Sequence, residues 1–363
     1  MRKKEIQHED CQQKLKSIDG ENILFIGIDY KHPKGGVASV ENVYSKIITP
    51  FYFIRSVIDG NNLQKLFIFF EALFHFLFYM YFKKNIKIIH IHGASYASFW
   101  RKSIFILIGK LFNKKIIYHI HGAEFAIFSQ KHRKIVQYII NKCDCIIALS
   151  ESWKKYFETT FKCNNVIIIK NIIESPKNHP ISHNKFTLLF LGRIGKRKGF
   201  YDLLQAIKNK KDIYKDKLIL FFGGDGEIEK IQKLIDKYDL SDIVQYQGWV
   251  SGDKKIELLN TADAYILPSY NEGLPISILE AMSYSLPIIS TNVGGIPEIV
   301  KNGENGFIVT PGDIKGIENA INRLMNNIDL CKQLGLESYS MVQQHLPQYV
   351  SKQLNNLYNE LLK

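Results

Sequence analysis

The chain has 363 residues, of which 46% are apolar and 23% charged, without a biased repeat or low-complexity tract. This length is typical of two domains, and the composition is that of a folded protein rather than a disordered or fibrous one. The five cysteines lack metal-ligand spacing, which favours reduced thiols in the cytosol over a zinc module. Residues 1–20 are polar and lack the apolar run of a secretory signal, so we expect a flexible leader.

The net charge of +13 is concentrated in the first half of the chain. Residues 1–180 contain 27 Lys/Arg against 14 Asp/Glu, whereas residues 181–363 contain 21 of each. Such asymmetry indicates an anionic partner. Because no helix-turn-helix, zinc-finger or RNP-type signature accompanies it, we expect no nucleic acid, and the sequence favours anionic lipid or a phosphorylated acceptor.

An apolar run fills residues 66–82 and is interrupted only by Glu71 and His75. Seventeen helical residues rise about 26 Å, which is short of a bilayer core. As a helix, this run is apolar on two opposite sides. Two interpretations are therefore possible: a helix buried between the sheet and another helix, and a helix that lies at a membrane interface. Lys83, Lys84 and Lys87 follow directly and favour peripheral attachment to the inner face of the cytoplasmic membrane. If the helix is buried, the stripe expected to face the core is Leu63, Leu66, Phe67, Phe70, Phe74, Leu77, Phe78 and Tyr81.

Short β-branched runs alternate with helical stretches along the chain, which predicts parallel sheets and an α/β fold class. A polar, proline-containing linker at 175–185 divides them into two Rossmann-like domains, 21–178 and 183–345, with a ligand cleft at the carboxyl ends of their strands. Residues 346–363 form a candidate helix that packs back on the first domain. The strands are expected at 22–28, 86–91, 115–120, 144–149, 166–169, 186–191, 217–222, 243–247, 264–267 and 287–290.

Glycines and cations stand where two of these strands end. Gly35 and Gly36 precede a helical stretch, where bare backbone admits a phosphate or sugar, although a plain turn explains them as well. Arg193 ends a strand, and Lys198 precedes a helix. A unit charge pair at about 4 Å gains about 4 kcal/mol at an effective dielectric of about 20, so two cations can replace a metal on a diphosphate. No Asp-x-Asp pair occurs to clamp such a metal, and an exposed basic loop is the alternative.

The segment PSYNEGLPISILEAM, residues 268–282, places Glu272 and Glu280 eight positions apart. Gly273 and Pro275 mark a helix start there. Free N–H groups at a helix N-terminus bind phosphate or sugar hydroxyls, and carboxylates accept hydrogen bonds from a diol.

Over residues 22–345, the motifs and their order along the chain resemble those of the retaining glycosyltransferases of family 4, which have the GT-B fold. The resemblance rests on the Glu-x7-Glu segment, Gly192-Arg193 with Lys198-Gly199, the GGDG turn at 223–226, HIHG at 90–93, HGAEF at 121–125, and NIIE at 171–174 where the family usually has Asn-Gly-Ile-Asp.

The resemblance implies a role for each matching residue, with no metal and no cofactor beyond a UDP- or GDP-linked sugar as co-substrate. His121 and Glu272 would lie at the catalytic centre. Arg193 and Lys198, with Gly35 and Gly36 as further candidates, would hold the donor diphosphate, and Glu280 the ribose. The remaining assignments are Gly273, Leu274, Pro275 and Ile276 for the donor sugar, Gly248, Trp249 and Val250 for the base, and His92, Glu124 and Asn171 as possible acceptor contacts.

The implied reaction retains the anomeric configuration by front-side attack, with the leaving diphosphate oxygen taking the acceptor proton. The expected function is transfer of a hexosyl-type residue to a membrane-proximal or lipid-linked saccharide in surface polysaccharide biosynthesis. A nucleotide-sugar epimerase or glycan phosphorylase of the same fold, or a non-catalytic membrane-associated scaffold, are the alternatives. A dehydrogenase is disfavoured because residues 27–36 lack G-x-G-x-x-G.

Overall fold

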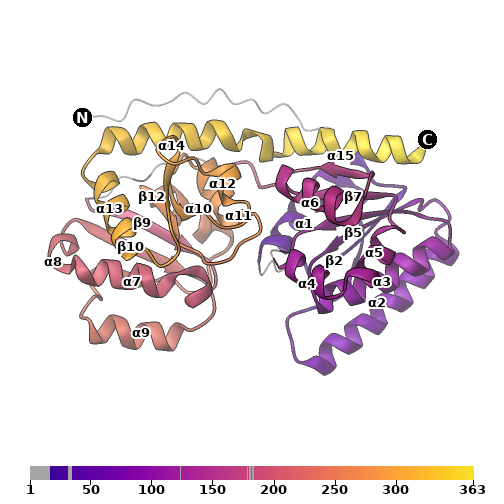
Figure 1. Cartoon of the computed structure of the whole chain (residues 1–363), viewed down its shortest axis with the longest axis horizontal. Helices are drawn as coiled ribbons and strands as arrows, with labels where there is room; N and C mark the ends of the chain where they lie inside the picture. Colours follow the sequence, from indigo (N-terminus) through magenta and orange to yellow (C-terminus); the bar gives the residue numbers. More distant parts are fainter. Residues whose placement is uncertain (1–16, 32–34, 123, 178, 180, 182–183) are drawn as a thin grey trace.

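The computed structural model describes residues 17–31, 35–122, 124–177, 179, 181 and 184–363. Two six-stranded sheets, parallel throughout, form the centres of two lobes that lie side by side (Figure 1). This arrangement confirms the predicted α/β fold class. The first sheet has the order β4 (Tyr52–Arg55), β2 (Ile23–Gly27), β5 (Ile88–Gly93), β6 (Lys115–Ile120), β7 (Cys145–Ala148) and β8 (Val166–Ile168). The second has the order β11 (Val244–Tyr246), β10 (Leu218–Gly223), β9 (Phe186–Leu191), β12 (Ala264–Leu267), β13 (Ile288–Thr291) and β14 (Gly306–Val309).

Helices cover both faces of the first sheet, because alternate side chains of each buried strand point to opposite faces. Ile89 and Ile91 of β5 belong to one apolar cluster with α2 (Asn62–Phe82), α3 (Ala97–Leu111), α4 (Phe125–Lys131), α5 (Arg133–Ile140) and α6 (Glu151–Phe161). Ile88 belongs to a second cluster with α1 (Gly36–Ile47) and α15 (Pro347–Leu362), and this cluster also contains the core of the second lobe. The two lobes therefore share apolar packing on one side of the first sheet.

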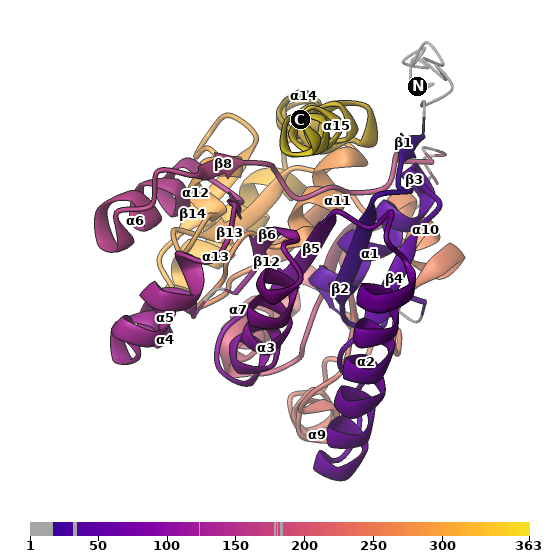
Figure 2. The same cartoon turned by 90° about the vertical axis from the view of Figure 1, so that its right-hand side faces the viewer.

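The second lobe carries the remaining helices, and the chain then returns to the first. α14 runs over the second lobe and α15 over the first, on the same side of the molecule (Figure 1). Figure 2, turned by 90°, shows these two helices nearly end-on. The helices are α7 (Phe200–Asn209), α8 (Lys211–Tyr214), α9 (Ile228–Lys237), α10 (Gly252–Thr261), α11 (Ile276–Ser283), α12 (Ile296–Ile299), α13 (Ile314–Met325) and α14 (Ile328–Val342), with short 3-10 turns η1 (Lys196–Lys198) and η2 (Gln343–His345).

The sequence pattern did not predict every strand. β4 and β14 have only four residues each and lie at sheet edges. Ile18 and Asp19, assigned above to the leader, instead form β1 (Ile18–Asp19), which pairs with β3 (Ile48–Thr49). The prediction of a flexible leader otherwise falls on residues 1–16, which lie outside the described residues.

The chain passes between the lobes after β8, and the described residues from there to β9 form no helix or strand. The Ile173 N–H donates to the carbonyl of His345 over 3.0 Å. The His345 ring in turn donates from Nδ1 to the carbonyl of Asn171 over 2.8 Å. The passage is therefore fastened to η2, just before α15 begins.

Helix α2 lies at the outside of the first lobe, with one side against β4 and α3. The stripe predicted to face the core is wrong: its side chains are half-buried or exposed, and the opposite side is buried. A position sandwiched between sheet and helix is likewise excluded. The inner side is formed by Ile68, Ala72, Phe76 and Met80, whose smaller Ala and flexible Met allow close approach to β4 and α3.

Candidate functional site

The predicted site segments of the two lobes meet where α1 contacts α11. Gly36, the first residue of α1, lies so close to the second lobe that an added Cβ would be 3.0 Å from the Ile276 side chain. The Asn171 side-chain amide donates to the carbonyl of Leu274 over 3.2 Å. Gly35, with φ of +100°, has open space where a Cβ would be. The glycines of the first lobe and the segment 273–276 thus face each other across the lobe boundary.

The basic loop after β9 surrounds a hollow of about 320 Å³, lined by Arg193, Ile194, Gly195, Lys196, Arg197, Lys198, Gly226 and Glu227. Arg193 is exposed, whereas Lys198 is half-buried. Gly199 has φ of +70°, and a Cβ there would lie 1.9 Å from the carbonyl oxygen of Pro268. Only glycine fits this approach, which brings the basic loop against the segment that carries Glu272.

Lys198 and Glu272 form an ion pair in which both side chains are largely shielded from water. The Ser269 hydroxyl donates to Oε1 of Glu272 over 2.7 Å. Burial lowers the pKa of Lys198, and the carboxylate of Glu272 opposes this shift. The cation expected to hold the diphosphate is therefore neutralised here by the acid expected near the donor sugar.

Glu280 has a partner that the sequence pattern did not reveal. Its Oε1 lies 2.6 Å from Nζ of Lys255 on α10, and both side chains are mostly buried. Burial alone would lower the pKa of Lys255, but Glu280 outweighs it and the pKa is raised. Helix α11 begins at Ile276, so Glu280 lies in its second turn. One carboxylate oxygen of Glu280 is held by Lys255, and the other has no hydrogen bond from a described residue.

The segment predicted to hold the base follows β11 and joins the two preceding loops. The Gly224 N–H donates to the carbonyl of Gly248 over 2.9 Å, and the Gly192 N–H to the carbonyl of Gly223 over 3.0 Å. The Trp249 side chain is 44% exposed. Main-chain hydrogen bonds thus align the three loops after β9, β10 and β11 side by side.

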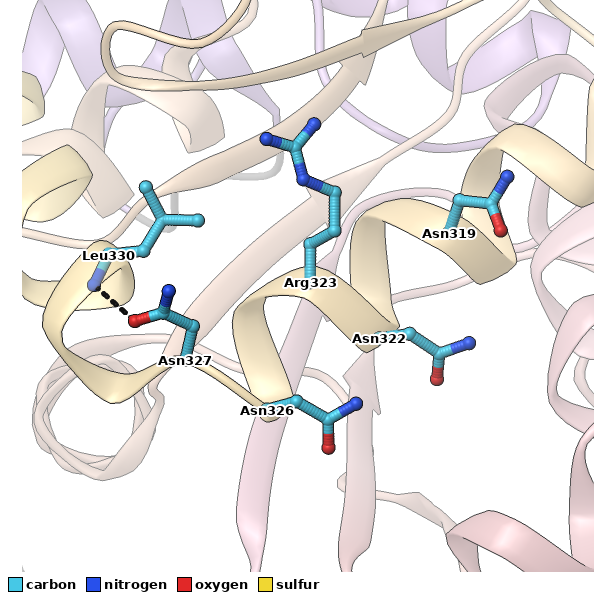
Figure 3. A pocket seen from close by; sticks show the side chains of 6 residues that line it. All are labelled: Asn319, Asn322, Arg323, Asn326, Asn327 and Leu330. Carbon is cyan, nitrogen blue, oxygen red and sulfur yellow. Dashed lines mark hydrogen bonds between the residues drawn. The ribbon is translucent and has the colours of Figure 1, made fainter.

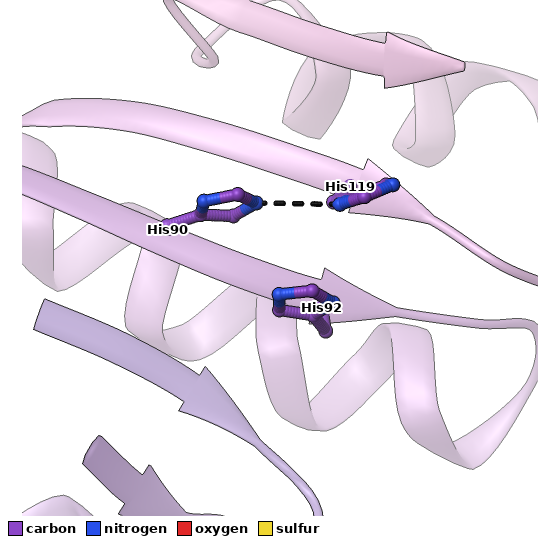
Figure 4. A group of neighbouring side chains, drawn as sticks. All are labelled: His90, His92 and His119. Carbon is purple, nitrogen blue, oxygen red and sulfur yellow. Dashed lines mark hydrogen bonds between the residues drawn. The ribbon is translucent and has the colours of Figure 1, made fainter. Parts of the chain in front are cut away.

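Four histidines lie on β5 and β6 or directly after them: His90 and His92 on β5, His119 on β6, and His121 just beyond the end of β6. His92 pairs with His119 in register, and Figure 4 shows both with His90 on the two neighbouring strands. His92 Nδ1 is 3.0 Å from His121 Nε2. His90 uses both ring nitrogens, at 2.8 Å from the Tyr358 hydroxyl and 3.4 Å from His119.

Burial lowers the pKa of each of these imidazoles, that of His121 to about 4 with partial opposition from Asn171. They are therefore neutral at pH 7. Ring nitrogens of His90, His92 and His119 lie within 4.8 Å of one another, but those of His90 are already engaged in hydrogen bonds, so we interpret the group as a hydrogen-bonded core. Glu124 is half-buried just before α4.

A larger hollow of about 730 Å³ lies on α13 and α14, away from all these residues. Figure 3 shows the side chains that line it, which are Asn319, Asn322, Arg323, Asn326, Asn327 and Leu330. None of the predicted site residues belongs to it.

Comparison with known families covers both lobes. Residues 46–175 match Glycosyltransferase Family 4, and residues 171–341 match Glycosyl transferases group 1. The chain belongs to the family 4, group 1 glycosyltransferases. This family 4 chain is 31% identical to the capsular polysaccharide biosynthesis glycosyltransferase CapM of Staphylococcus aureus, over 52% of its own length and 49% of CapM. Alignments with four curated relatives span 45 to 65% of those relatives.

Solved structures share the fold of this family 4 chain. Sucrose-phosphate synthase from Thermosynechococcus elongatus has a TM-score of 0.77 at 20% identity, with 94% of this chain and 98% of that one covered. HepE from Anabaena, in complex with UDP-glucose, has a TM-score of 0.72 at 16% identity, with 95% and 100% covered. These likenesses confirm the predicted GT-B fold.

Proposed function

We propose that the chain transfers a hexosyl-type residue from a nucleotide diphosphate sugar to a membrane-proximal or lipid-linked saccharide acceptor in surface polysaccharide biosynthesis. One observation carries the proposal: the ion pairs Lys198–Glu272 and Lys255–Glu280 flank the start of α11, opposite Gly36 of the first lobe. This arrangement offers cations, free N–H groups and carboxylates to one ligand. CapM acts in capsule biosynthesis by name, and HepE was solved with UDP-glucose, which supports this class of donor.

Each part of a donor has a partner in the cleft. The diphosphate would replace Glu272 as the counter-ion of Lys198, with Arg193 as a second cation and the N–H groups before α11 as further donors. The free oxygen of Glu280 would accept hydrogen bonds from the ribose. The released Glu272 would then accept hydrogen bonds from hydroxyls of the donor sugar.

Leaving-group stabilisation would be the main contribution of the protein to the rate. Charge grows on the diphosphate as the glycosidic bond breaks, and the fixed cations neutralise it without reorganising. The leaving oxygen would take the acceptor proton, so no protein base is required for retention. Neutral His121, at the carboxyl end of β6, would position the reacting groups as a hydrogen-bond partner. With these cations present, we expect turnover without a divalent metal.

The test is thermal stabilisation by a panel of UDP-, GDP- and ADP-sugars, followed by transfer assays with the best donor. Lys198→Ala and Glu280→Ala should abolish transfer with the fold intact. Lys254→Ala, which changes the exposed lysine next to Lys255 on α10, should not abolish it. Near-normal turnover in both site variants would refute the assignment. Product formation from the donor alone would instead indicate an epimerase, and a requirement for inorganic phosphate a phosphorylase. EDTA should leave the rate unchanged.

A further inference from the structure

Helix α2 presents a continuous apolar side to solvent. The apolar side chains on this side recur mostly every three or four residues, which places them on one face of the helix, opposite the buried face. Soluble monomers rarely expose an apolar patch of this extent. The exposed fractions run from 48 to 78%, for Leu63, Leu66, Phe67, Phe70, Phe74, Phe78, Tyr81 and Phe82.

The helix is long and apolar enough to cross a membrane by length and composition alone, with 22% of its most apolar window buried. Its inner side is nevertheless fixed to the first lobe. Phe69 and Phe76 contact the ring of Phe105 on α3, with centroids 5.9 and 5.2 Å apart. A helix that keeps one side packed on a folded domain cannot span a bilayer, so only its outer side is free to contact a membrane or a partner.

The neighbouring helices extend this surface. α2 contacts α3, and α3 contacts α5, on one face of the first sheet. Both views show the three helices in a row (Figures 1 and 2). Their outward side chains include Trp100, Ile104 and Leu111 of α3, Ile127 of α4, and Ile135 and Tyr138 of α5, each more than a third exposed.

Cations border the apolar side chains. Between Lys83 and Lys134 the sequence has eleven Lys/Arg and a single acid, Glu124. Lys102 is buried, and Lys110 and Lys115 contact Asp144, so these three are not counted as available. The exposed ones are Lys83, Lys84 and Lys87 after α2, and Lys131, Arg133 and Lys134 at the junction of α4 and α5.

We propose that the outer sides of α2, α3 and the α4–α5 pair dock flat on an anionic lipid bilayer, with the aromatic rings inserted at the headgroup level. A second protein would satisfy the apolar side, but the combination of aromatic rings with bordering cations and almost no acids matches an anionic membrane interface. Each cation brought to such a surface increases the partition coefficient about fivefold.

The docked orientation places the candidate acceptor side near the lipid. Glu124 immediately precedes α4, and Ile127 of the docking surface follows three residues later. This consequence rests on the proposed function, because it would bring a lipid-linked acceptor to the cleft. The docking itself does not depend on the transfer reaction.

The full-length protein should co-sediment with vesicles of phosphatidylcholine and phosphatidylglycerol at 7:3, in low salt and without any sugar nucleotide. Phe67→Gln/Phe74→Gln should reduce the partition coefficient at least tenfold. Lys83→Gln/Lys84→Gln/Lys87→Gln should reduce it up to about 100-fold in low salt if all three cations contact lipid, and much less in high salt. Pure phosphatidylcholine vesicles should bind far less protein.

Two control variants test whether the effects are specific to the proposed surface. Ile328→Gln/Tyr349→Gln replaces two similarly exposed apolar side chains outside the surface, and Lys233→Gln/Lys237→Gln/Lys352→Gln removes three exposed cations there. Both should bind like the unchanged protein, and all variants should keep the circular dichroism spectrum and the thermal stabilisation by the donor.

The proposal is overturned if the unchanged protein does not bind anionic vesicles in low salt, or if Phe67→Gln/Phe74→Gln binds normally. It is also overturned if that variant only converts a dimer into a monomer, which would make the surface an interface between copies of this chain. Because no substrate is present, failure of the transfer assay would leave the vesicle result unaffected.

Discussion

Lys255 on α10 holds one carboxylate oxygen of Glu280 on α11 at 2.6 Å, in a place where both side chains are mostly shielded from water. The pair fixes the direction in which the second oxygen points. In the proposed donor complex that oxygen accepts hydrogen bonds from the ribose, so Lys255 acts on the nucleotide through Glu280.

Replacing Lys255 by Met should therefore weaken nucleotide binding. Glu280 loses its charged partner and becomes free to turn, and a charge-assisted hydrogen bond is worth about 1.5 to 3 kcal/mol. We expect the dissociation constant for the nucleotide to rise about tenfold or more, as measured by calorimetry. Lys254→Met, at the neighbouring exposed position, is the control. Equal affinities for the Lys255→Met variant and the unchanged protein would contradict a positioning role.

The Lys198–Glu272 pair predicts a change in pH dependence. Burial lowers the pKa of Lys198, and Glu272 keeps it from falling further. Glu272→Gln removes the negative charge but keeps the shape, so the pKa of Lys198 should drop and its neutral form appear at lower pH. The alkaline limb of kcat/KM should then move towards neutrality. An alkaline limb at an unchanged position in Glu272→Gln would show that Lys198 does not control it.

His345 predicts a loss of stability in acid. Burial lowers its pKa from 6.5 to about 4, so between these values the unfolded chain binds a proton that the folded chain does not. The free energy of unfolding should therefore be highest above pH 6.5 and fall by about 3 kcal/mol from this group alone as the pH approaches 4. His345→Asn keeps a donor near Nδ1 but does not titrate.

Urea unfolding at pH 7.5 and 5.0 measures this effect. The difference between the two pH values should shrink in His345→Asn and stay unchanged in His75→Asn, which alters an exposed histidine on α2. If His345→Asn keeps the full difference, the acid sensitivity belongs to other groups.

Lys102 and Glu41 are two buried ionisable side chains next to the end of β2, before the loop that leads to Gly35. Lys102 Nζ donates to the Gly27 carbonyl over 3.0 Å and to the Ser56 hydroxyl over 2.6 Å. Glu41 accepts from the Ile28 N–H over 3.0 Å. Burial raises the pKa of Glu41 to about 8 and lowers that of Lys102 to about 7, while each opposes the shift of the other.

Lys102→Met should lower the free energy of unfolding by about 1 to 3 kcal/mol, because the buried Ser56 hydroxyl loses its donor and Glu41 loses the cation that opposes the rise of its pKa. The double variant Glu41→Gln/Lys102→Met should lose less than the sum of the two single variants, since each side chain opposes the pKa shift of the other. Urea unfolding of both single variants and the double variant gives the coupling energy. A double variant that loses the sum of the two single effects would show that the two side chains do not interact.

The main strands were predictable because each is an apolar, β-branched run bounded by polar or glycine residues. β6, β9 and β12 begin and end at the predicted residues. β4 and β14, with four residues each, were missed although β12 is no longer, so length alone does not explain the difference. The orientation of α2 was not predictable, because the sequence of a helix that is apolar on both sides does not indicate which side is buried. Only the shape of the neighbouring β4 and α3 decides which side packs.

The site was predictable in its motifs but not in its pairings. Gly36 and Ile276 are 240 positions apart, and their contact follows from how the two lobes sit together. Lys255 stands in an ordinary polar stretch, so no local pattern distinguishes it from Lys254. The roles of Arg193, His121 and the other assigned residues stay predictions until a donor complex or kinetic data test them.

The return of α15 to the first lobe has a consequence for biosynthesis. Tyr358 contributes its hydroxyl to His90 inside that lobe, and Val350, Leu354 and Leu357 belong to the same apolar cluster. The amino-terminal lobe, although translated first, therefore lacks part of its interior until α15 has left the ribosome. Nascent chains should consequently stay open to proteases and chaperones until α15 has been synthesised, and a bulky fusion partner is better attached away from α15.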